Sequence, residues 1–315
     1  MLDADALLAS ARRPLVVGIG GGGDVVGALA LAEPLRRVHG AGPVVGGTTW
    51  ERMPIDAQPG PRRLGEIAGA VEPVGPAALL AGADTRVRES GVRFAEARVA
   101  ELIGEETVLV DPSDGPHAVA DALAAAIARL DADLLVLLDV GGDALAHGDE
   151  AGLASPLCDA VILAGGAQLA ARGMPVLGAV FGPACDGELE FDEVLARVAE
   201  IAAGGGIAGA RWLTGPAAAL LERAVELVPT EASAQPLRAF RGQVGTTTIR
   251  GGRREVEISP LGALTVFFDV SVALDTAARL ARAVRSARSL EEANDVLHRL
   301  GVRTELDSER AALEV

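Results

Sequence analysis

Short apolar runs alternate with longer helical patterns along the first two thirds of the chain, and this alternation limits its possible folds most strongly. The clearest run is DLLVLLDV at residues 133–140, which is apolar at nearly every position. A strand with one face in water would alternate apolar and polar residues, whereas a strand buried on both faces does not. Further strands are expected at 14–19, 42–47, 106–111 and 174–182, and helices at about 24–38, 117–130, 156–172 and 188–203. The pattern predicts an α/β fold with a Rossmann-like, mostly parallel sheet covered by helices on both faces.

The pattern changes after residue 206, where the regular alternation ends. Residues 1–206 are expected to form the Rossmann-like core, with an irregular excursion near 48–90 that is rich in Pro, Gly and Arg and contains one short helix. Residues 207–315 are expected to form a C-terminal α+β elaboration of the same domain. It would contain helices near 215–228, the hairpin TTTIRGGRREVEISP with paired glycines at its turn, the strand ALTVFFDV and two terminal helices.

Composition excludes several classes of function. The net charge of −16 argues against nucleic acid and against an anionic membrane surface as partners, because phosphate contacts need local positive charge. All 28 basic residues are Arg, so a phosphate-loop lysine and a Schiff-base lysine are impossible. Cys158 and Cys185 are far apart and are expected to pack as small apolar residues. With no long apolar segment and no signal-peptide pattern, the expected location is the cytoplasm.

A glycine-rich turn, GIGGGGD at residues 18–24, follows the first expected strand. Gly18, Gly20 and Gly23 match the dinucleotide-binding pattern GxGxxG in the correct strand-to-helix context. However, the Asp24 carboxylate would repel a pyrophosphate, and the second strand ends without an acid at the usual place to hold a ribose hydroxyl. NAD is therefore an unlikely cofactor. The competing interpretation of Asp24 is a helix N-cap, for which aspartate is well suited.

Acidic and hydroxyl side chains follow every expected strand of the core. They are Asp24 after the first strand; Thr48, Thr49 and Glu51 after the second; Asp111 and Asp114 after the third; Asp139, Asp143, His147, Asp149 and Glu150 after the fourth; and Asp186 and Glu188 after the fifth. The carboxyl ends of parallel strands meet at one edge of a sheet, where ligands bind. Carboxylates brought together there would repel, and either a divalent cation such as Mg²⁺ or a bound proton relieves that repulsion. Independent roles as caps and turns remain the main alternative.

Several further residues have competing interpretations. Arg86, Arg88 and Arg93 are the nearest candidates to balance the acids from the irregular excursion. In ASPLCDA, Ser155 is expected to cap the next helix, with Asp159 in its first turn. His147 is a candidate base or ligand, although a single loop histidine more often has neither role. A serine nucleophile is not indicated, since GxSxG is absent.

Four blocks of sequence together resemble the uncharacterised family called domain of unknown function 1152. They are GIGGGGDVVGAL at 18–29, DVGGDALAHGDE at 139–150, SPLCDA at 155–160 and GPACDGELE at 182–190. The resemblance covers most of the chain and implies a Rossmann-like α/β fold with the acidic blocks near one site. The second block is also similar to the glycine-rich, acid-containing block of D-glutamate cyclase-like proteins, which keeps cyclase or lyase chemistry among the options.

We therefore predict a metabolic enzyme of the hydrolase or cyclase/lyase type, acting on a small polar metabolite that is phosphorylated or nucleoside-like. Asp139 and Asp143 are the expected ligands of a divalent cation, and Glu150 or Asp186 the expected general base. The expected substrate-binding residues are Gly20, Gly21, Gly22, Gly23, Asp24, Thr48, Thr49, Gly141 and Gly142. The alternatives are a non-enzymatic nucleotide- or metabolite-binding regulator, with homo-oligomerisation through C-terminal elements, and a NAD-dependent oxidoreductase.

Overall fold

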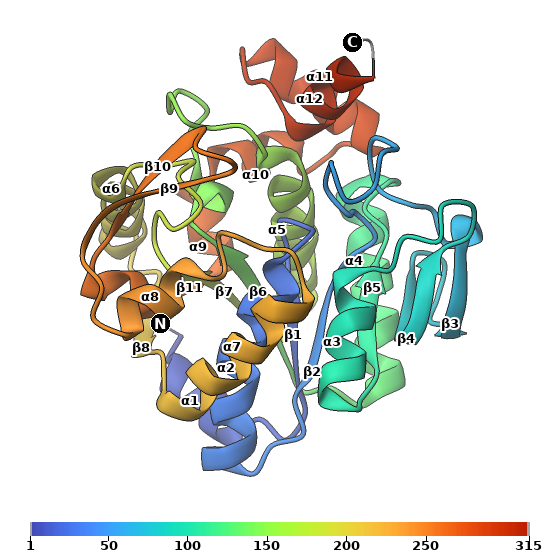
Figure 1. Ribbon diagram of the computed structural model, residues 1–315, viewed down its shortest axis with the longest axis horizontal. Helices are drawn as coiled ribbons and strands as arrows, with labels where there is room; N and C mark the ends of the chain where they lie inside the picture. Colours follow the sequence, from blue (N-terminus) through green and yellow to red (C-terminus); the bar gives the residue numbers. More distant parts are fainter. Residues whose placement is uncertain (1, 314–315) are drawn as a thin grey trace.

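A nine-stranded sheet runs through the centre of the molecule (Figure 1). The computed structural model describes residues 2–313. Five parallel strands form the middle of the sheet, in the order β5 (Thr107–Val110), β2 (Val44–Thr48), β1 (Pro14–Gly18), β6 (Leu134–Val140) and β7 (Val176–Phe181). Every residue of β1, β5, β6 and β7 is buried, which explains why these runs are apolar at consecutive positions. The predicted α/β fold is confirmed.

The order of the strands reverses beside β1. The chain builds β2 and β5 on one side of β1 and then crosses to place β6 and β7 on the other side. Val16 of β1 consequently pairs with Val45 of β2 on one side and with Val136 of β6 on the other. Such a reversal leaves a crevice at the carboxyl ends of the two central strands, because their connections turn away in opposite directions. The crevice of this sheet therefore lies where β1 and β6 end.

Antiparallel strands extend the sheet at both edges. β4 (Ala78–Val87) and β3 (Ile67–Pro73) lie beyond β5, and β11 (Leu264–Asp269) and β8 (Ile207–Trp212) lie beyond β7. The prediction of an irregular excursion near 48–90 was wrong for this part, which contains β3, β4 and the short 3-10 helix η1 (Leu64–Glu66). β3 is an edge strand whose register with β4 shifts twice, so it tolerates the Gly and Pro residues that obscured it in the sequence.

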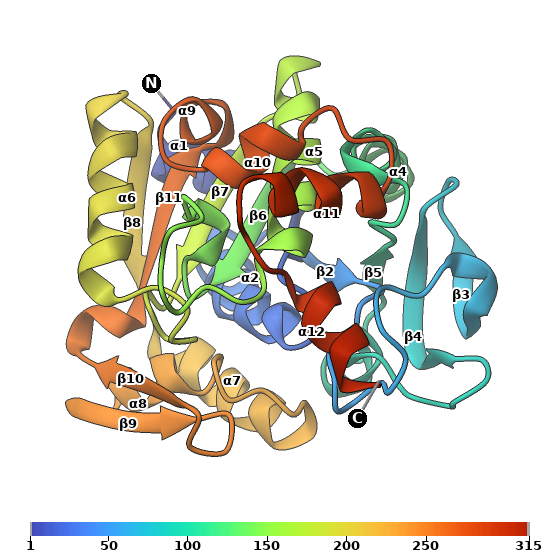
Figure 2. The same cartoon turned by 90° about the horizontal axis from the view of Figure 1, so that it is seen from above.

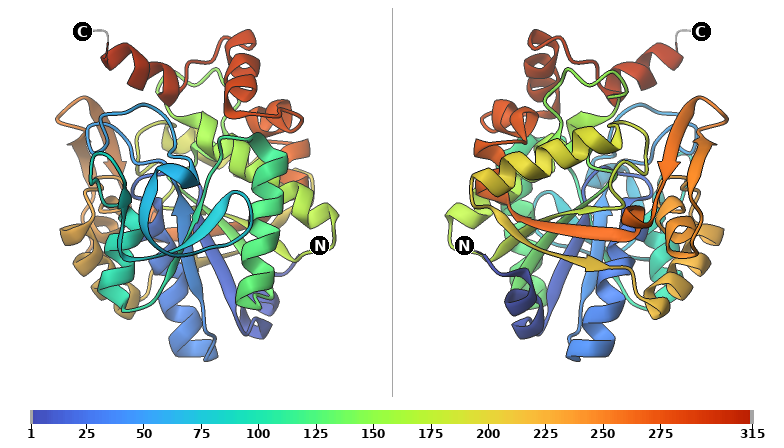
Figure 3. Two further views of the ribbon diagram at one scale, coloured as in Figure 1. Left: turned by 90° about the vertical axis from the view of Figure 1, so that its right-hand side faces the viewer. Right: turned by 90° about the vertical axis from the view of Figure 1, so that its left-hand side faces the viewer.

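Helices cover both faces of the sheet, with one apolar core on each side (Figure 3). One face carries α4 (Gly115–Leu130), α5 (Pro156–Ala171), α6 (Phe191–Ala203), α9 (Val270–Asp275), α10 (Arg279–Val284) and α11 (Leu290–Arg299). The other carries α1 (Ala4–Ser10), α2 (Asp24–His39), α3 (Ala95–Ile103), α7 (Gly215–Leu227) and α8 (Gln235–Phe240). Helix α5 is buried along most of its length because α9, α10 and α11 pack over its outer side.

Residues 207–313 contain the predicted hairpin, formed by β9 (Gly245–Ile249) and β10 (Arg254–Ile258), and the predicted strand β11. They also contain two elements that were not predicted, β8 and the 3-10 helix η3 (Pro260–Ala263). Where two terminal helices were predicted, residues 270–313 form four short ones, ending with α12 (Glu305–Ala312). Figure 2 looks down on α11 and α12, which lie above the sheet in Figure 1. Strands β8 and β11 belong to the same sheet as β1.

Candidate functional site

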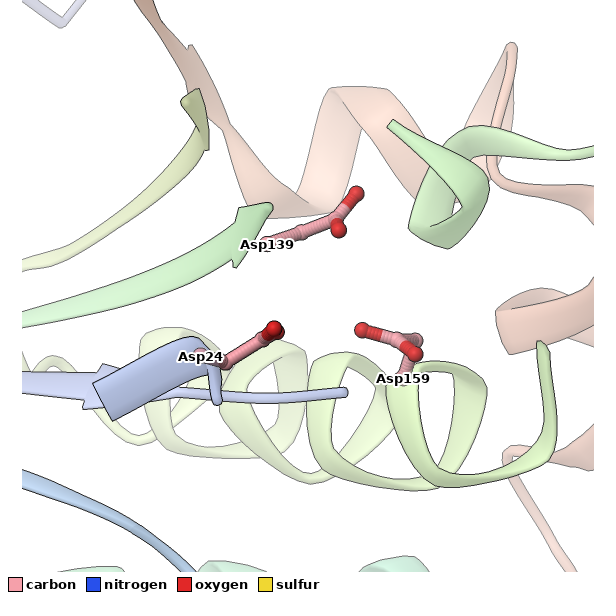
Figure 4. A group of neighbouring side chains, drawn as sticks. All are labelled: Asp24, Asp139 and Asp159. Carbon is pink, nitrogen blue, oxygen red and sulfur yellow. The ribbon is translucent and has the colours of Figure 1, made fainter. Parts of the chain in front are cut away.

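Three aspartates converge at the crevice where β1 and β6 end (Figure 4). Asp24 is the first residue of α2, Asp139 lies near the end of β6, and Asp159 lies in the first turn of α5. One carboxylate oxygen of each lies within 4.8 Å of the corresponding oxygens of the other two. We call Asp24, Asp139 and Asp159 the aspartate trio. Its members come from three elements because helices that follow parallel strands begin at the carboxyl edge of the sheet.

The glycine turn brings the backbone close to the aspartate trio. The Gly20 N–H donates to Asp24 Oδ2 at 2.8 Å. A Cβ atom at Gly20 would lie 2.8 Å from Asp24 Oδ2 and 3.1 Å from Asp159 Oδ2, within the space between the two carboxylates. Glycine at this position therefore keeps the space between the two carboxylates open. The predicted alternative, in which Asp24 is the N-cap of α2, is wrong, because Gly23 occupies the cap position.

Few protein donors balance the aspartate trio. Asp139 is 1% exposed, and its Oδ2 accepts from the Ala144 N–H at 3.1 Å. Asp159 is also 1% exposed, yet its Oδ1 has no hydrogen-bond partner within residues 2–313. A buried carboxylate oxygen without a donor is costly unless a proton or a cation meets it. The trio thus lacks a positive partner of its own.

Burial and mutual repulsion raise the pKa of every member of the trio. Burial raises the pKa of Asp24 to about 7, against opposing contributions from the Gly20 N–H and Arg52. Burial, followed by the charges of Asp24 and Asp186, raises the pKa of Asp139 well above its usual value. Burial also dominates for Asp159, with Asp139 and Asp24 adding to the rise in its pKa. These shifts favour protonated carboxyls in the metal-free protein, and a bound divalent cation would reverse them.

Arg52 lies beside the trio, although it was not among the predicted site residues. Its Nη2 donates to the Gly20 carbonyl and, at 3.1 Å, to Glu305 Oε1. Its guanidinium lies 4.4 Å from the centroid of the Trp50 ring. Burial opposes its charge, but the neighbouring acids, Glu305 first among them, raise its pKa further. A signal was available in its position just after Thr48 and Thr49, within the segment that follows β2.

A second group of three acids lies next to the aspartate trio. One oxygen each of Asp143, Asp186 and Glu188 lies within 4.8 Å of the others, and all three residues are buried. We call them the Glu188 trio. Glu188 Oε1 accepts from Arg250 Nη2 at 3.0 Å, and Oε2 accepts from the N–H groups of Ala154 and Ser155, both at 2.8 Å. Glu188 is therefore fully engaged by protein donors.

The pKa shifts within the Glu188 trio differ in sign. Burial alone would raise the pKa of Glu188, but Arg250, the Ser155 hydroxyl and Arg254 outweigh it and lower the pKa. Burial, followed by the charge of Glu188, raises the pKa of Asp186 to about 7. Burial, followed by the charges of Asp159 and Glu188, raises that of Asp143 well above its usual range. The charge of Glu188 therefore adds to the rise in pKa of its two neighbours, Asp143 and Asp186.

The structure divides the predicted metal and base residues between these groups. Asp139 belongs to the aspartate trio, whereas Asp143 and Asp186 belong to the Glu188 trio. Glu150 lies in neither group. Its carboxylate accepts from the N–H groups of His147 and Gly148, both at 2.8 Å, and lies 3.3 Å from Arg197 Nη2. The Nε2 atom of His147 lies 3.0 Å from Glu200 Oε2. Glu150 thus stabilises its own loop.

The predicted substrate-binding glycines have several distinct roles. Gly20 N–H is used by Asp24, and Gly22 N–H donates to the Trp50 carbonyl at 2.9 Å, so neither is free for a phosphate. A Cβ at Gly141 would lie 2.3 Å from Asp186 Cγ, and one at Gly142 would lie 3.1 Å from a Val194 methyl. A Cβ at Gly23 would meet the Thr230 side chain, and one at Gly21 the Trp50 carbonyl. These glycines mainly permit close packing.

The remaining polar side chains are spread over several contacts. Thr48 Oγ1 accepts from Cys158 Sγ at 3.8 Å, while the buried Thr49 Oγ1 has no hydrogen-bond partner in the described part of the chain. Glu51 accepts from the Ala95 N–H at the start of α3, Asp111 accepts from the Ser113 N–H, and Asp114 pairs with Arg63 at the surface. These three acids therefore act as caps, turns or surface partners, as the alternative interpretation expected.

The arginines considered as balancing charges have other partners. Arg86 and Arg88 donate to backbone carbonyls of the β3–β4 region, and Arg93 pairs with Glu101. Ser155 occupies the N-cap position of α5, as predicted, but its hydroxyl donates to Glu188 and makes no cap bond. Glu305 accepts from the first amides of α5 instead. The role of Glu305 as acceptor for these amides could not be predicted from the sequence, because Glu305 is 148 residues from Leu157.

Comparison with known proteins identifies the family. The model of the family described as "Protein of unknown function (DUF1152)" matches residues 15–313, essentially the whole chain. The chain belongs to this family. The resemblance of its glycine and acidic blocks is thereby confirmed, and the match includes both acid trios and α12. No curated protein and no solved structure matches the chain. Within residues 2–313, no helix is both long and apolar enough to cross a membrane.

Proposed function

We propose that this DUF1152 protein is a divalent-metal-dependent enzyme of the hydrolase or cyclase/lyase type that acts on a small polar metabolite. The aspartate trio would hold the cation. The observation that supports this most directly is Asp159, whose buried Oδ1 has no donor although two further carboxylates lie within 4.8 Å. Three carboxylate oxygens at one point suit Mg²⁺ or Mn²⁺, which prefer oxygen ligands. We also propose a cytoplasmic location, on the basis of the sequence alone.

The neighbouring acids fit a role in proton transfer. Asp143 and Asp186 lie beside the aspartate trio, and their pKa values are raised chiefly by burial, that of Asp186 to about 7. A carboxyl that titrates near neutral pH exchanges protons efficiently with a reacting group. Asp186 is our candidate general base, with its position fixed by the absence of a side chain at Gly141. A bound cation would supply Lewis-acid polarisation of a substrate oxygen.

Nucleotide binding of the Rossmann type is less well supported by this site. The end of the glycine turn that would receive a pyrophosphate faces the Asp24 carboxylate, which accepts the Gly20 N–H. An anionic substrate group would therefore need the cation, or Arg52, as its partner. A small metabolite with an oxygen that binds the metal and a group that reaches Arg52 fits this charge pattern.

The proposal is tested by measuring Mn²⁺ binding to the whole protein through the spectroscopic signal of free Mn²⁺. We expect one cation to bind with micromolar or tighter affinity, and the Asp139→Asn variant to lose it. Asp149→Asn is the matched control, because Asp149 is an exposed acid of the same loop. Equal affinities in the two variants would refute a metal site at the aspartate trio.

Turnover is then assayed by incubating the protein with a panel of small phosphorylated and carboxylated metabolites, with Mn²⁺ or with a chelator. We expect conversion of at least one compound only with Mn²⁺, and loss of conversion in Asp186→Asn. Ligand binding that is independent of the metal and is followed by no conversion would favour the regulator instead.

A further inference from the structure

Helix α12 closes over the candidate site through two buried carboxylates. Glu305 and Glu309 are 5% and 6% exposed and lie one helical turn apart. Glu309 accepts from Trp50 Nε1 at 3.0 Å and from the Gly60 N–H at 2.8 Å. These contacts tie α12 to the segment that follows β2, over the carboxyl edge of the sheet (Figure 2). Charged side chains are seldom this deeply buried unless hydrogen-bond or ionic partners offset the cost of desolvation.

Glu305 makes the contacts that a bound anion would make. Its Oε2 accepts from the Leu157 N–H at 3.0 Å, and its Oε1 accepts from the Cys158 N–H at 2.9 Å and from Arg52 Nη2 at 3.1 Å. The two amides belong to the first turn of the 16-residue helix α5, whose N-terminus attracts negative charge. Two backbone N–H groups and a guanidinium form a receptor for a carboxylate or a phosphate.

This receptor adjoins the aspartate trio, because Asp159 follows Cys158 directly. With α12 in place, two buried polar atoms at this junction have no hydrogen-bond partner in residues 2–313: Arg52 Nη1 and Asp159 Oδ1. The first is a cationic donor and the second an anionic acceptor. A substrate whose acidic group meets Arg52 while a neighbouring oxygen shares a cation with Asp159 would satisfy both atoms.

Access to the inner two members of the trio requires movement. Asp139 and Asp159 are each 1% exposed, whereas Asp24 is only half-buried. Two surface cavities, of about 310 and 330 Å³, lie along α2, and neither is lined by any of the six acids. The four terminal helices are short, and α12 contacts the site through the polar side chains of Glu305 and Glu309. Leu306 is its one buried apolar side chain, so little apolar surface holds α12 in place.

We propose that α12 is a displaceable lid, and that Glu305 holds the place of the substrate's own acidic group, a carboxylate or a phosphate. Binding of that group displaces Glu305 from Arg52 and the start of α5 and releases α12. Because the substrate class builds on the metal-dependent function proposed above, the test separates anion binding from metal binding. The shared chemistry is an anion with at least two oxygens available to donors.

The test uses the whole protein in a Trp212→Phe background, which leaves Trp50 as the reporter of α12. The chain has two tryptophans, and Trp212, on the edge strand β8, is 47% exposed and outside the site. Inorganic phosphate and malonate are the two anionic probes, each titrated with and without Mn²⁺. We expect one of them to shift Trp50 emission to the red and to speed amide exchange across residues 305–312, because α12 leaves the indole.

Glu305→Gln is the decisive variant, and Glu291→Gln is its control. Glu291 pairs with Arg310 of α12 at the exposed surface. Glu291→Gln therefore weakens a contact of the same helix while Glu305 stays bound to Arg52 and the start of α5. We expect Glu305→Gln to bind the anion about tenfold more tightly, since an internal competitor has been removed, and the control to remain within about twofold. The anion that gains affinity identifies the acidic group.

Three results would overturn the lid. They are no binding of either anion, binding without faster exchange in α12, and unchanged anion affinity in Glu305→Gln with only a lower thermal midpoint. If Glu305→Gln does not fold, amide exchange in the Trp212→Phe protein still decides the matter. Mn²⁺ binding without any effect of the anions would leave the metal site intact and remove the lid. Displacement of α12 by an anion without Mn²⁺ binding would support the lid and refute the metal site.

Discussion

The two acid trios differ less in their density of carboxylates than in what surrounds those carboxylates. In the Glu188 trio, Arg250, Arg254 and two backbone N–H groups face Glu188, and its pKa falls although burial acts to raise it. In the aspartate trio, burial and mutual repulsion prevail, and Asp159 keeps an oxygen without a donor. The β9–β10 hairpin supplies arginines to only one of the trios.

This difference shows how a structural group of acids can be distinguished from a candidate ligand site. A group of acids within 4.8 Å of one another is common to both trios. What separates them is whether the fold supplies the counter-charge. Arg52, the arginine beside the aspartate trio, is itself committed to Glu305 and the Gly20 carbonyl. The aspartate trio therefore lacks the counter-charge that the fold supplies to Glu188, and this is why we propose a cation there.

The largest effect is expected from Asp159→Asn. The substitution removes a ligand charge, so Mn²⁺ affinity should fall about 100-fold, equivalent to roughly 2.7 kcal/mol. In metal-free buffer at pH 8 the same variant should be more stable than the wild type by about 1 kcal/mol, because a buried negative charge is removed. Mn²⁺ titration and urea unfolding measure the two quantities. A destabilised metal-free Asp159→Asn variant would remove the distinction between the trios.

Glu188→Gln is expected to lower the free energy of unfolding, whereas Asp159→Asn is expected to raise it. Here a buried charge with built-in partners is lost, and Arg250 and Arg254 remain without their acid. Breaking such a pair costs about 3–5 kcal/mol when both partners are buried, and the partial exposure of Arg250 reduces the expected loss to about 2 kcal/mol. Urea unfolding measures this loss, and Mn²⁺ affinity should stay within about threefold of the wild type. A large loss of metal affinity with unchanged stability would instead make Glu188 a ligand.

The sequence was sufficient for the fold and for only part of the site, for physical reasons that particular residues illustrate. Because β6 is buried along its whole length, its sequence DLLVLLDV is easily recognised as a strand. β3 alternates in burial and has register shifts, so its sequence resembles that of a loop. Asp139 follows from the rule that ligands bind at the carboxyl ends of strands. Asp159 was interpreted as a first-turn acid of α5, because local capping chemistry explains it equally well. Only the tertiary approach to Asp24 distinguishes the two roles.

Contacts that join distant parts of the chain were beyond prediction. Glu305 reaches the start of α5 across 148 residues, and Arg250 reaches Glu188 across 62. No periodicity or motif records such pairings, since each depends on how α12 and the β9–β10 hairpin pack. Consequently the acids were visible in sequence, but their counter-charges were not.

The pH dependence of stability should also differ between the trios. Asp24 has a pKa of about 7 in the folded protein, above its usual 3.8, so the folded state binds more protons than the unfolded state between these values. Its contribution to stability therefore falls as pH rises from about 4 to 7. The contribution of Glu188 to stability changes with pH in the opposite direction. Its pKa is lower in the folded protein than its usual value, so its ionised form stabilises the fold at higher pH, and this contribution is lost on acidification.

This difference is measured by thermal and urea unfolding of the chelator-treated protein from pH 5 to 8. The wild type should lose roughly 1 to 2 kcal/mol relative to Asp24→Asn over this range. Mn²⁺ at pH 8 should restore the loss, since the cation replaces the protons. Parallel stability curves for the wild type and Asp24→Asn would show that Asp24 ionises without cost.

The smallest expected effect comes from Gly20→Ala, which changes the space between the carboxylates and no charge. The added Cβ would lie 2.8 Å from Asp24 Oδ2 and 3.1 Å from Asp159 Oδ2, the far ends of two side chains rather than backbone atoms. Mn²⁺ affinity should therefore fall about tenfold, while the free energy of unfolding should change by less than about 1 kcal/mol. Gly65→Ala is the control, because a Cβ there meets nothing within 4 Å. If Gly20→Ala binds Mn²⁺ as tightly as the control, Asp24 and Asp159 do not share a cation, and the aspartate trio is a proton-sharing group like its neighbour.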